Sequence, residues 1–253
     1  MFGLGRRPVE RLDFIVAGAQ KSGTTALNYY LKRDPRIALP VRKELHFFDN
    51  DAFFTGSTVV SYYRLHEMFP PAPAGSIAGE NTPNYLYSPP ALPRIRDYNP
   101  AIKLIILLRN PIDRAFSQWN MQRVRGIEPL DFLDAISAEP NRLTQLDPEQ
   151  RRKFAYVDRG RYGVQLSRAL HLFPPRQLLI LKYEEFRAHQ PEVVEKVFRF
   201  LGLSPVGFRP IEAHDIAYKR RIRAGERVAV HELLRDDIAR LEQLLNWDCS
   251  NWR

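Results

Sequence analysis

The sequence predicts an α/β fold in which a central parallel β-sheet carries helices on both faces. Five short apolar runs lack a polar–apolar alternation, which indicates strands buried on both faces. Helical periodicity lies between these runs, and alternating β and α segments are typical of a doubly wound parallel sheet. The five runs are DFIVAG (13–18), RIAL (36–39), SIAGE (76–80), KLIILLR (103–109) and LLILKY (178–183).

Amphipathic helices are predicted where apolar residues recur at i, i+3 and i+4. The predicted helix around 194–201 has Pro191 at its start and Gly202 at its end, and these residue types are common at the two ends of a helix. The three segments with the clearest pattern are 27–31, 194–201 and 234–245.

The remaining segments predict connections rather than further domains. Proline-rich stretches at 70–75 and 88–93 are predicted to be surface connections, and the polar stretch 139–153 is predicted to be a loop or a short exposed helix. No repeat and no linker divides the chain, so one domain over residues 1–253 is expected. Within it, residues 1–11 are expected to form a flexible N-terminal segment.

Composition limits the classes of function. The chain has 38 Lys and Arg against 29 Asp and Glu, and its net charge of +9 predicts attraction to nucleic acid, anionic lipid, an acidic polymer or a polyphosphorylated cofactor. No apolar run reaches the roughly 18 residues needed to span a bilayer, and no secretory signal is recognised. The single cysteine, Cys249, fits a reducing compartment, so a cytoplasmic location is expected.

The stretch AGAQKSGTT (17–25) joins the first predicted strand to a helix. A glycine-bearing turn at this place directs backbone N–H groups toward an anion. Gly18 and Gly23 have the spacing of a nucleotide-binding P-loop, so a P-loop-like sheet is expected. However, Thr24 stands where a P-loop has its lysine, and a lysine comes three residues earlier, at Lys21. The loop therefore suits a phosphate group other than the γ-phosphate of a nucleoside triphosphate.

The most apolar strand is followed by Arg109, whereas a P-loop NTPase uses a strand-end Asp to help hold Mg²⁺. A guanidinium group suits phosphate oxygens rather than a metal ion. The two strand ends together predict a metal-independent cofactor that carries phosphates at two separate places.

These motifs resemble those of sulfotransferases that use 3′-phosphoadenosine 5′-phosphosulfate (PAPS). The 5′-phosphosulfate loop of that family is similar to QKSGTTAL (20–27), and its 3′-phosphate segment is similar to LLRNPIDRAFSQW (107–119). The similarity is closest to the heparan sulfate sulfotransferase-like and bacterial branch and extends from about residue 12 to the C-terminus. The segments that fit this branch are KELHFFD (43–49), GENTPNYL (79–86), RGRYGVQL (159–166) and FLGL (200–203).

The resemblance implies a set of cofactor-binding residues and no requirement for a metal ion. Tyr162 is implied to lie near the nucleotide, and Arg220, Arg221 and Arg223 are candidates for a loop over the cofactor phosphates. The 5′-phosphosulfate would be held by Lys21, Ser22, Gly23, Thr24 and Thr25, and the 3′-phosphate by Arg109 and Ser117.

Sulfuryl transfer needs a group that stabilises the departing phosphate and a base that takes the proton of the acceptor. Lys21 is expected to fill the first role. Glu44 and His46 are both candidates for the second, because in an extended segment their side chains point to the same side. The resemblance favours Glu44 as base, with His46 as a supporting or pocket residue. Asn81 stands after Glu80, where heparan-type enzymes have a lysine, which places more of the leaving-group role on Lys21.

We therefore expect an enzyme that moves a sulfuryl group from PAPS to a hydroxyl or amine and releases 3′-phosphoadenosine 5′-phosphate (PAP). A small molecule, saccharide, lipid or other natural product remains open as acceptor. Two other hypotheses are a P-loop kinase or NTPase with an altered loop, and a non-catalytic polyanion binder with a steep salt dependence. No nucleic-acid motif is found, so no nucleic-acid partner is expected. The aromatic residues that follow the predicted base either line an acceptor pocket or belong to the core: Phe47, Phe48, Phe53, Phe54, Tyr62 and Tyr63.

Overall fold

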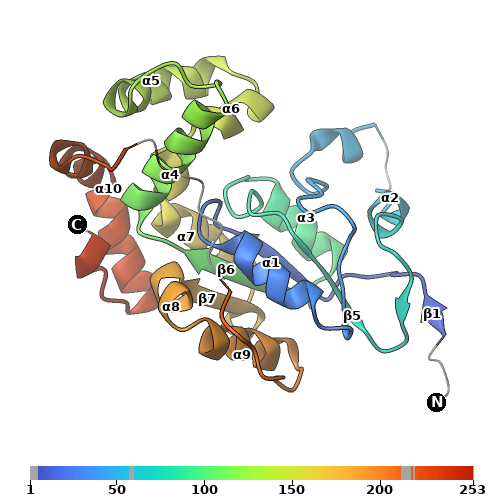
Figure 1. Ribbon diagram of the computed structural model, residues 1–253. Coiled ribbons are helices and arrows are strands. Elements are labelled where there is room, and N and C mark those ends of the chain that lie inside the picture. Colours follow the sequence, from blue (N-terminus) through green and yellow to red (C-terminus); the bar gives the residue numbers. More distant parts are fainter. Residues whose placement is uncertain (1–4, 57–59, 212–217, 219, 253) are drawn as a thin grey trace. The chain divides into compact units, whose positions relative to one another are not determined.

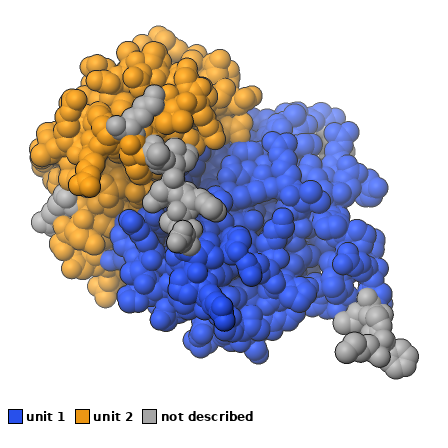
Figure 2. Space-filling view, in the orientation of Figure 1, with its two compact units in different colours: residues 1–108, 168–213 blue, residues 109–167, 214–253 orange. Residues whose placement is uncertain are grey.

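The structure is a computed structural model that describes residues 5–56, 60–211, 218 and 220–252. The chain forms two compact units, which Figure 2 shows in different colours. Unit 1 comprises residues 1–108 and 168–213, and unit 2 comprises residues 109–167 and 214–253. The expectation of one domain over the whole chain stays a prediction.

Unit 1 contains the predicted sheet, in the strand order β3-β5-β2-β6-β7 (Figure 1). Every pair of neighbouring strands is parallel, as the apolar runs predict. The central strand β2 pairs with β5 on one side and β6 on the other, so Phe14 lies opposite both Gly79 and Lys103. The strands are β2 (Phe14–Gly18), β3 (Ile37–Ala38), β5 (Ile77–Asn81), β6 (Lys103–Leu108) and β7 (Leu178–Lys182).

Both faces of this sheet are buried. On one face, Val16 and Leu107 pack in a cluster with apolar residues of three helices, among them Leu27. The alternate residues Ile15 and Ile106 are also fully buried, although they point to the other face. The α/β fold with a parallel sheet flanked by helices is therefore confirmed. The three helices are α1 (Thr24–Lys32), α8 (Tyr183–Ala188) and α9 (Gln190–Leu201).

Helix α9 ends where its sequence predicts. Pro191 stands in the first turn, and Gly202 is the C-cap with a φ of 84°. A residue at this left-handed φ is most often glycine, because a Cβ atom is disfavoured there.

Two proline-rich segments do more than connect elements. Residues 70–75 contain β4 (Ala72–Pro73), which pairs antiparallel with β1 (Arg6–Arg7), so the N-terminal segment expected to be flexible contains a paired strand. The expectation of a surface connection at 88–93 is wrong, because α3 (Ala91–Tyr98) begins there and buries Ala91 and Leu92. Three short elements complete unit 1: η1 (Asp51–Phe53), α2 (Tyr63–His66) and η3 (Pro175–Gln177).

Unit 2 is built from helices. The stretch 139–153 contains the end of one helix, in which Glu139 is buried, and then a short helix, Pro148–Phe154, in which no residue is buried, so the expectation of a short exposed helix fits only the second half of the stretch. The elements are α4 (Pro111–Val124), α5 (Phe132–Gln145), α6 (Pro148–Phe154), η2 (Asp158–Gly160), α10 (Ala224–Leu245) and η4 (Ser250–Trp252). Helix α7 (Tyr162–Leu172) contains the boundary between the two units.

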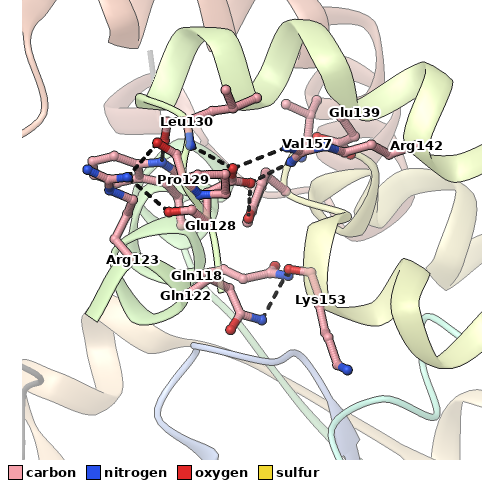
Figure 3. Close-up of polar contacts among 12 residues, drawn as sticks. Gln118, Gln122, Arg123, Glu128, Pro129, Leu130, Glu139, Arg142, Lys153 and Val157 are labelled. Atoms are coloured by element: carbon pink, nitrogen blue, oxygen red, sulfur yellow. Dashed lines mark hydrogen bonds and ion pairs between the residues drawn. The ribbon is translucent and has the colours of Figure 1, made fainter. Parts of the chain in front are cut away.

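A buried polar network fixes these helices, as Figure 3 shows. The carboxylate of Glu128 accepts hydrogen bonds from Arg142 and from the hydroxyl of Tyr156. The carboxylate of Glu139 accepts from the backbone N–H groups of Val157 and Asp158, both at 2.8 Å. Because buried polar groups are costly without partners, these bonds specify how α5 packs on the 153–158 segment.

Candidate active site

The loop after β2 turns sharply into α1. The backbone N–H of Ala19 donates to the carbonyl of Leu107 at 2.7 Å, which holds the start of the loop against β6. Lys21 and Gly23 then adopt left-handed φ values of 69° and 85°. A Cβ atom on Gly18 would lie 2.7 Å from the side chain of Leu86, so only glycine fits there.

The start of α1 suits an anion. Its N-cap is Gly23, no side chain caps its first N–H groups, and its first turn has no acidic residue. Ser22 is fully buried, and its Oγ has no hydrogen-bond partner among the described residues. Thr24 is buried and Thr25 is exposed. Unsatisfied N–H groups and a hydroxyl donor at a helix N-terminus are what a phosphate or sulfate group requires.

The proposed base lies on a segment that is not extended. Glu44 and His46 have φ values of 64° and 53°, so the expectation of an extended segment is wrong. The two side chains nevertheless lie close together, because Nε2 of His46 is 3.8 Å from Oε2 of Glu44. The left-handed turns thus produce the proximity that was expected from strand alternation.

Burial raises the pKa of Glu44, but its neighbours outweigh this effect. The nearby imidazole of His46 and the charge of Lys43, whose Nζ lies 2.6 Å from Oε1, lower the pKa of the carboxyl group to about 2. Glu44 is therefore ionised at neutral pH. It can accept a proton, but as a weak base.

Asp49 is a site residue that the sequence analysis missed. Its Oδ2 lies 2.9 Å from Nδ1 of His46 and also accepts a hydrogen bond from Asn84. When His46 is protonated, Nδ1–H donates to Asp49 and Nε2–H faces the carboxylate of Glu44. The spacing of a histidine and an aspartate three residues apart in KELHFFD is the signal that could have identified Asp49.

The end of β5 connects the base segment to the loop after β2. The carbonyl oxygen of Asn81 accepts from the N–H of Glu44 at 3.1 Å, and its side-chain Nδ2 donates to the carbonyl of Thr24 at 2.7 Å. In the sequence, Asn81 bears on the site through the positive charge that it lacks, which places more of the leaving-group role on Lys21. In the structure it also joins two segments that both carry proposed catalytic residues.

Glu80, next to Asn81, is fully buried. Burial raises its pKa to about 7 against the hydrogen bonds from Tyr85 and Thr82, which lower it. The hydroxyl of Thr82 donates to its Oε2 at 2.8 Å. This carboxyl group was not predicted to belong to the site.

The predicted 3′-phosphate residues lie at the start of unit 2. The side chain of Asn110 accepts from the N–H groups of Ile112 and Asp113 and so caps α4, as its place before Pro111 predicts. Arg109 precedes this cap, and its Nη2 lies 3.5 Å from the hydroxyl of Tyr218. Ser117 is two turns into α4 and is 7% exposed.

The other basic candidates of unit 2 differ in their surroundings. The guanidinium of Arg220 makes two hydrogen bonds to Glu226, at 2.7 and 2.6 Å, and lies over the rings of Phe116 and Trp119. Arg221 and Arg223 are exposed. The structure therefore gives Arg220 a partner within its own unit and leaves the two other arginines at the surface.

Tyr162 begins α7 and is 1% exposed. Its ring packs edge-on against Trp252, with centroids 6.2 Å apart. The next two N–H groups of α7, those of Gly163 and Val164, donate to the carboxylate of Asp237. Tyr162 is thus a core residue of unit 2, and the first turn of its helix already has an anionic partner.

Of the six aromatic residues that follow the base, Phe47 and Phe48 belong to the core, whereas Phe53, Phe54 and Tyr62 are partly buried. Phe47 and Phe48 are fully buried, and their rings contact one another at 5.3 Å. Phe53 stacks on Phe47 at 4.6 Å. In contrast, Tyr63 is 73% exposed.

Within the described residues, no group of three or more His, Cys, Asp or Glu side chains is arranged to hold a metal ion. No helix in the part of the chain that the structure describes is long and apolar enough to cross a membrane.

Comparison with known proteins places the chain in a family. A family model described as "Sulfotransferase domain" matches residues 11–217. The bifunctional heparan sulfate N-deacetylase/N-sulfotransferase 3 of Mus musculus is 33% identical over 200 residues, which cover 76% of this chain and 22% of the relative. The membrane-associated sulfotransferase kil1 of Dictyostelium discoideum is 38% identical over 109 residues, which cover 43% of this chain and 22% of the relative. The chain thus spans less than a quarter of the length of these relatives.

Solved structures agree. The crystal structure of a sulfotransferase from Alicyclobacillus acidocaldarius matches with a TM-score of 0.80 and 30% identity, over 97% of this chain and 100% of that chain. Mouse sulfotransferase SULT7A1, complexed with PAP, matches with a TM-score of 0.50 and 16% identity over 89% of this chain and 65% of that chain, which is a likeness of fold alone. The family model, the sequence relatives and the solved structures give one answer: the chain belongs to the sulfotransferase domain family.

Proposed function

We propose that this enzyme transfers the sulfuryl group of PAPS to a hydroxyl or amine of an acceptor. In this proposal Glu44 is the base, and Lys21 stabilises the departing phosphate. The observation that carries the proposal is the position of two strand ends. Strands β2 and β6 are parallel neighbours, so the loop with Lys21 and the chain leading into Arg109 leave the sheet at the same edge. In open α/β sheets, ligands bind at this edge, where the order of the strands reverses.

The residues of the loop after β2 fit a phosphosulfate group. The buried Ser22 hydroxyl has no hydrogen-bond partner among the described residues, and α1 begins without a side-chain cap. Gly23 permits close backbone approach, and no acidic side chain stands in the first turn to repel an anion. We assign the 5′-phosphosulfate to residues 21–25 and the 3′-phosphate to Arg109 and Ser117. When bound, PAPS supplies a sulfuryl group on a good leaving group.

The chain's own residues then divide the work of the transfer. The ammonium of Lys21 offsets the negative charge that grows on the departing phosphate oxygen. The ionised carboxylate of Glu44 accepts the proton that the acceptor loses as its oxygen or nitrogen attacks sulfur. His46 orients Glu44 from one side and is itself oriented by Asp49. No metal ion is required in this scheme.

The proposed acceptors are hydroxyl- or amine-bearing small molecules, saccharides, lipids or other natural products. The relatives that match most of this chain are named as heparan sulfate N-deacetylase/N-sulfotransferases, which favours testing saccharides first. The single buried Cys249 supports a reducing, cytoplasmic location for the enzyme.

Isothermal titration with PAP in the presence of EDTA tests the cofactor. We expect micromolar binding by the wild type and a loss of about tenfold or more in Arg109→Ala, because a charged hydrogen bond to phosphate is worth about 1.5–3 kcal/mol. Arg96→Ala, which removes an exposed arginine of α3, is the matched control and should bind as the wild type does. No binding of PAP by the wild type would refute the proposal.

A transfer assay with radiolabelled PAPS tests the base. We expect Glu44→Gln to lose turnover while it still binds PAP. Loss of both together would make Glu44 a structural residue. Mg²⁺-dependent hydrolysis of ATP by the wild type would instead support an altered P-loop NTPase.

A further inference from the structure

The base segment needs support from outside itself. Glu44 and His46 both have left-handed φ values, which are unfavourable for a residue with a Cβ atom. Two of the groups that hold their backbone come from the end of β5. The N–H of Glu44 donates to the carbonyl of Asn81 at 3.1 Å, and the N–H of His46 lies 3.5 Å from Oγ1 of Thr82.

A second hydroxyl holds the next two residues of this segment. The hydroxyl oxygen of Tyr85 accepts from the N–H of Phe47 at 3.0 Å and from the N–H of Phe48 at 3.4 Å. Three successive N–H groups, those of residues 46–48, thus donate to side-chain hydroxyls. A hydroxyl has only one hydrogen, so an oxygen that accepts from an N–H must direct its own hydrogen elsewhere.

Glu80 receives those hydrogens. Its carboxyl group is fully buried, and its Oε2 accepts from the hydroxyl of Thr82 at 2.8 Å. The hydroxyl of Tyr85 lies near enough to lower the pKa of the same carboxyl group, whose Oε1 makes no other hydrogen bond within the described residues. With their hydrogens bound to Glu80, both hydroxyls turn lone pairs toward the base segment. Within the described residues the carboxyl group makes no hydrogen bond to residues 44–48, so we infer that it acts on them through Thr82 and Tyr85.

We propose that Glu80 is a positioning residue for sulfuryl transfer, which fixes the hydroxyls of Thr82 and Tyr85 as acceptors and thereby holds Glu44 and His46 in their left-handed turns. The proposal rests on the proposed function, because it takes Glu44 as the base. It concerns a different residue and a different measurable property, the order of residues 44–48.

Hydrogen exchange in Glu80→Gln is the first test. A glutamine has one acceptor oxygen and one N–H donor group, so one of the two hydroxyls faces a donor instead of an acceptor. We expect amides 46–48 to exchange about tenfold faster than in the wild type, as the loss of about one hydrogen bond predicts, while the amides of β6 change less. Glu139→Gln makes the same substitution at another buried glutamate, in unit 2, and should leave amides 46–48 unchanged.

A matched pair at Thr82 tests the relay without changing a charge. Thr82→Ser keeps the hydroxyl and should keep the protection of the His46 amide. Thr82→Val removes the hydroxyl and should lose that protection, whether or not Glu80→Gln folds. Tyr85→Phe should expose amides 47 and 48 in the same way. Equal exchange in Thr82→Val and Thr82→Ser, or an increase spread evenly over the whole chain, would overturn the proposal.

The activity readout separates positioning from general stability. In Glu80→Gln we expect kcat to fall while the KM for PAPS stays within about threefold. We also expect the acid limb of the pH profile of kcat to move to higher pH, because a displaced His46 no longer lowers the pKa of Glu44. An unchanged acid limb would overturn the proposal. Failure of the wild-type protein to bind PAP would refute the proposed function. The exchange of amides 46–48 tests the role of Glu80 independently of PAP binding.

Discussion

The ammonium of Lys43 lies 2.6 Å from Oε1 of Glu44, on the opposite oxygen from His46. Burial favours the neutral form of Glu44, but these two neighbours outweigh it and lower the pKa of the carboxyl to about 2. The proposed base is therefore ionised at neutral pH and has a low proton affinity. Both properties follow from side chains next to it in the sequence.

Lys43→Met should raise the pKa of Glu44 from about 2 toward its ordinary 4.5. Because only the ionised carboxylate accepts a proton, activity is present above this pKa and is lost as the pH falls through it. The acid limb of the pH profile of kcat/KM should therefore move to higher pH. Lys32→Met, at an exposed position of α1, is the control and should not move it. An acid limb that stays in place would show that Glu44 is not the group that titrates.

Asn81→Ala should lose the hydrogen bond from Nδ2 to the carbonyl of Thr24 and about 1 kcal/mol of stability. The turnover of Asn81→Ala should fall by more than this loss of stability explains, because Asn81 joins the phosphate loop to the base segment. Asn99→Ala removes another buried asparagine that bonds a backbone carbonyl, that of Leu12, and should lose stability with normal turnover. Urea unfolding and the transfer assay measure the two effects. Equal turnover in the two variants would show that Asn81 has no role in catalysis beyond its contribution to stability.

Gly23→Ala and Gly202→Ala separate a steric effect from a backbone effect. Both glycines end or begin a helix at nearly the same φ, 85° and 84°. A Cβ atom on Gly23 would lie 2.8 Å from the ring of Tyr183, whereas one on Gly202 meets nothing within 4 Å. We expect Gly202→Ala to cost about 1 kcal/mol and to bind PAP normally. Gly23→Ala should cost more and lose PAP binding, as calorimetry and thermal unfolding would show.

Glu139→Gln should change how stability depends on pH. Burial raises the pKa of Glu139 to about 7, although two backbone N–H groups oppose this. Between its ordinary 4.5 and about 7, the folded protein keeps a proton that the unfolded chain has lost, so this group makes stability fall as pH rises through that window.

In Glu139→Gln this fall should shrink by on the order of 1–3 kcal/mol, measured by urea unfolding between pH 4.5 and 7.5. Glu149→Gln, at an exposed position of α6, should leave the slope as it is. A steeper fall in Glu139→Gln would mean that the two N–H bonds outweigh burial and keep Glu139 ionised.

The five strands of the parallel sheet in unit 1 could be predicted because their signals are local. Apolar runs such as KLIILL have no polar face, so they predict strands buried on both faces. Gly202 predicts the end of a helix, because glycine readily adopts the left-handed φ of the C-cap. Unit 2 was harder to predict. Within the polar stretch 139–153, Asp147 and Pro148 form a local start signal for α6, whereas the burial of Glu139 depends on backbone partners at 157 and 158, which no local pattern reveals.

By itself, the sequence determined the family, the five strands of the parallel sheet, and the loop with its displaced lysine, because these depend on residue types at short spacing. The tertiary structure decided the arrangement around the base. Asn81 joins the site through a hydrogen bond to Thr24, 57 positions away, and the hydroxyl of Tyr85 holds the N–H of Phe47 across 38 positions. Glu44 and His46 approach each other through left-handed turns that the chain does not favour alone. Such turns persist only where distant groups hold them, and that support exists only in the folded protein.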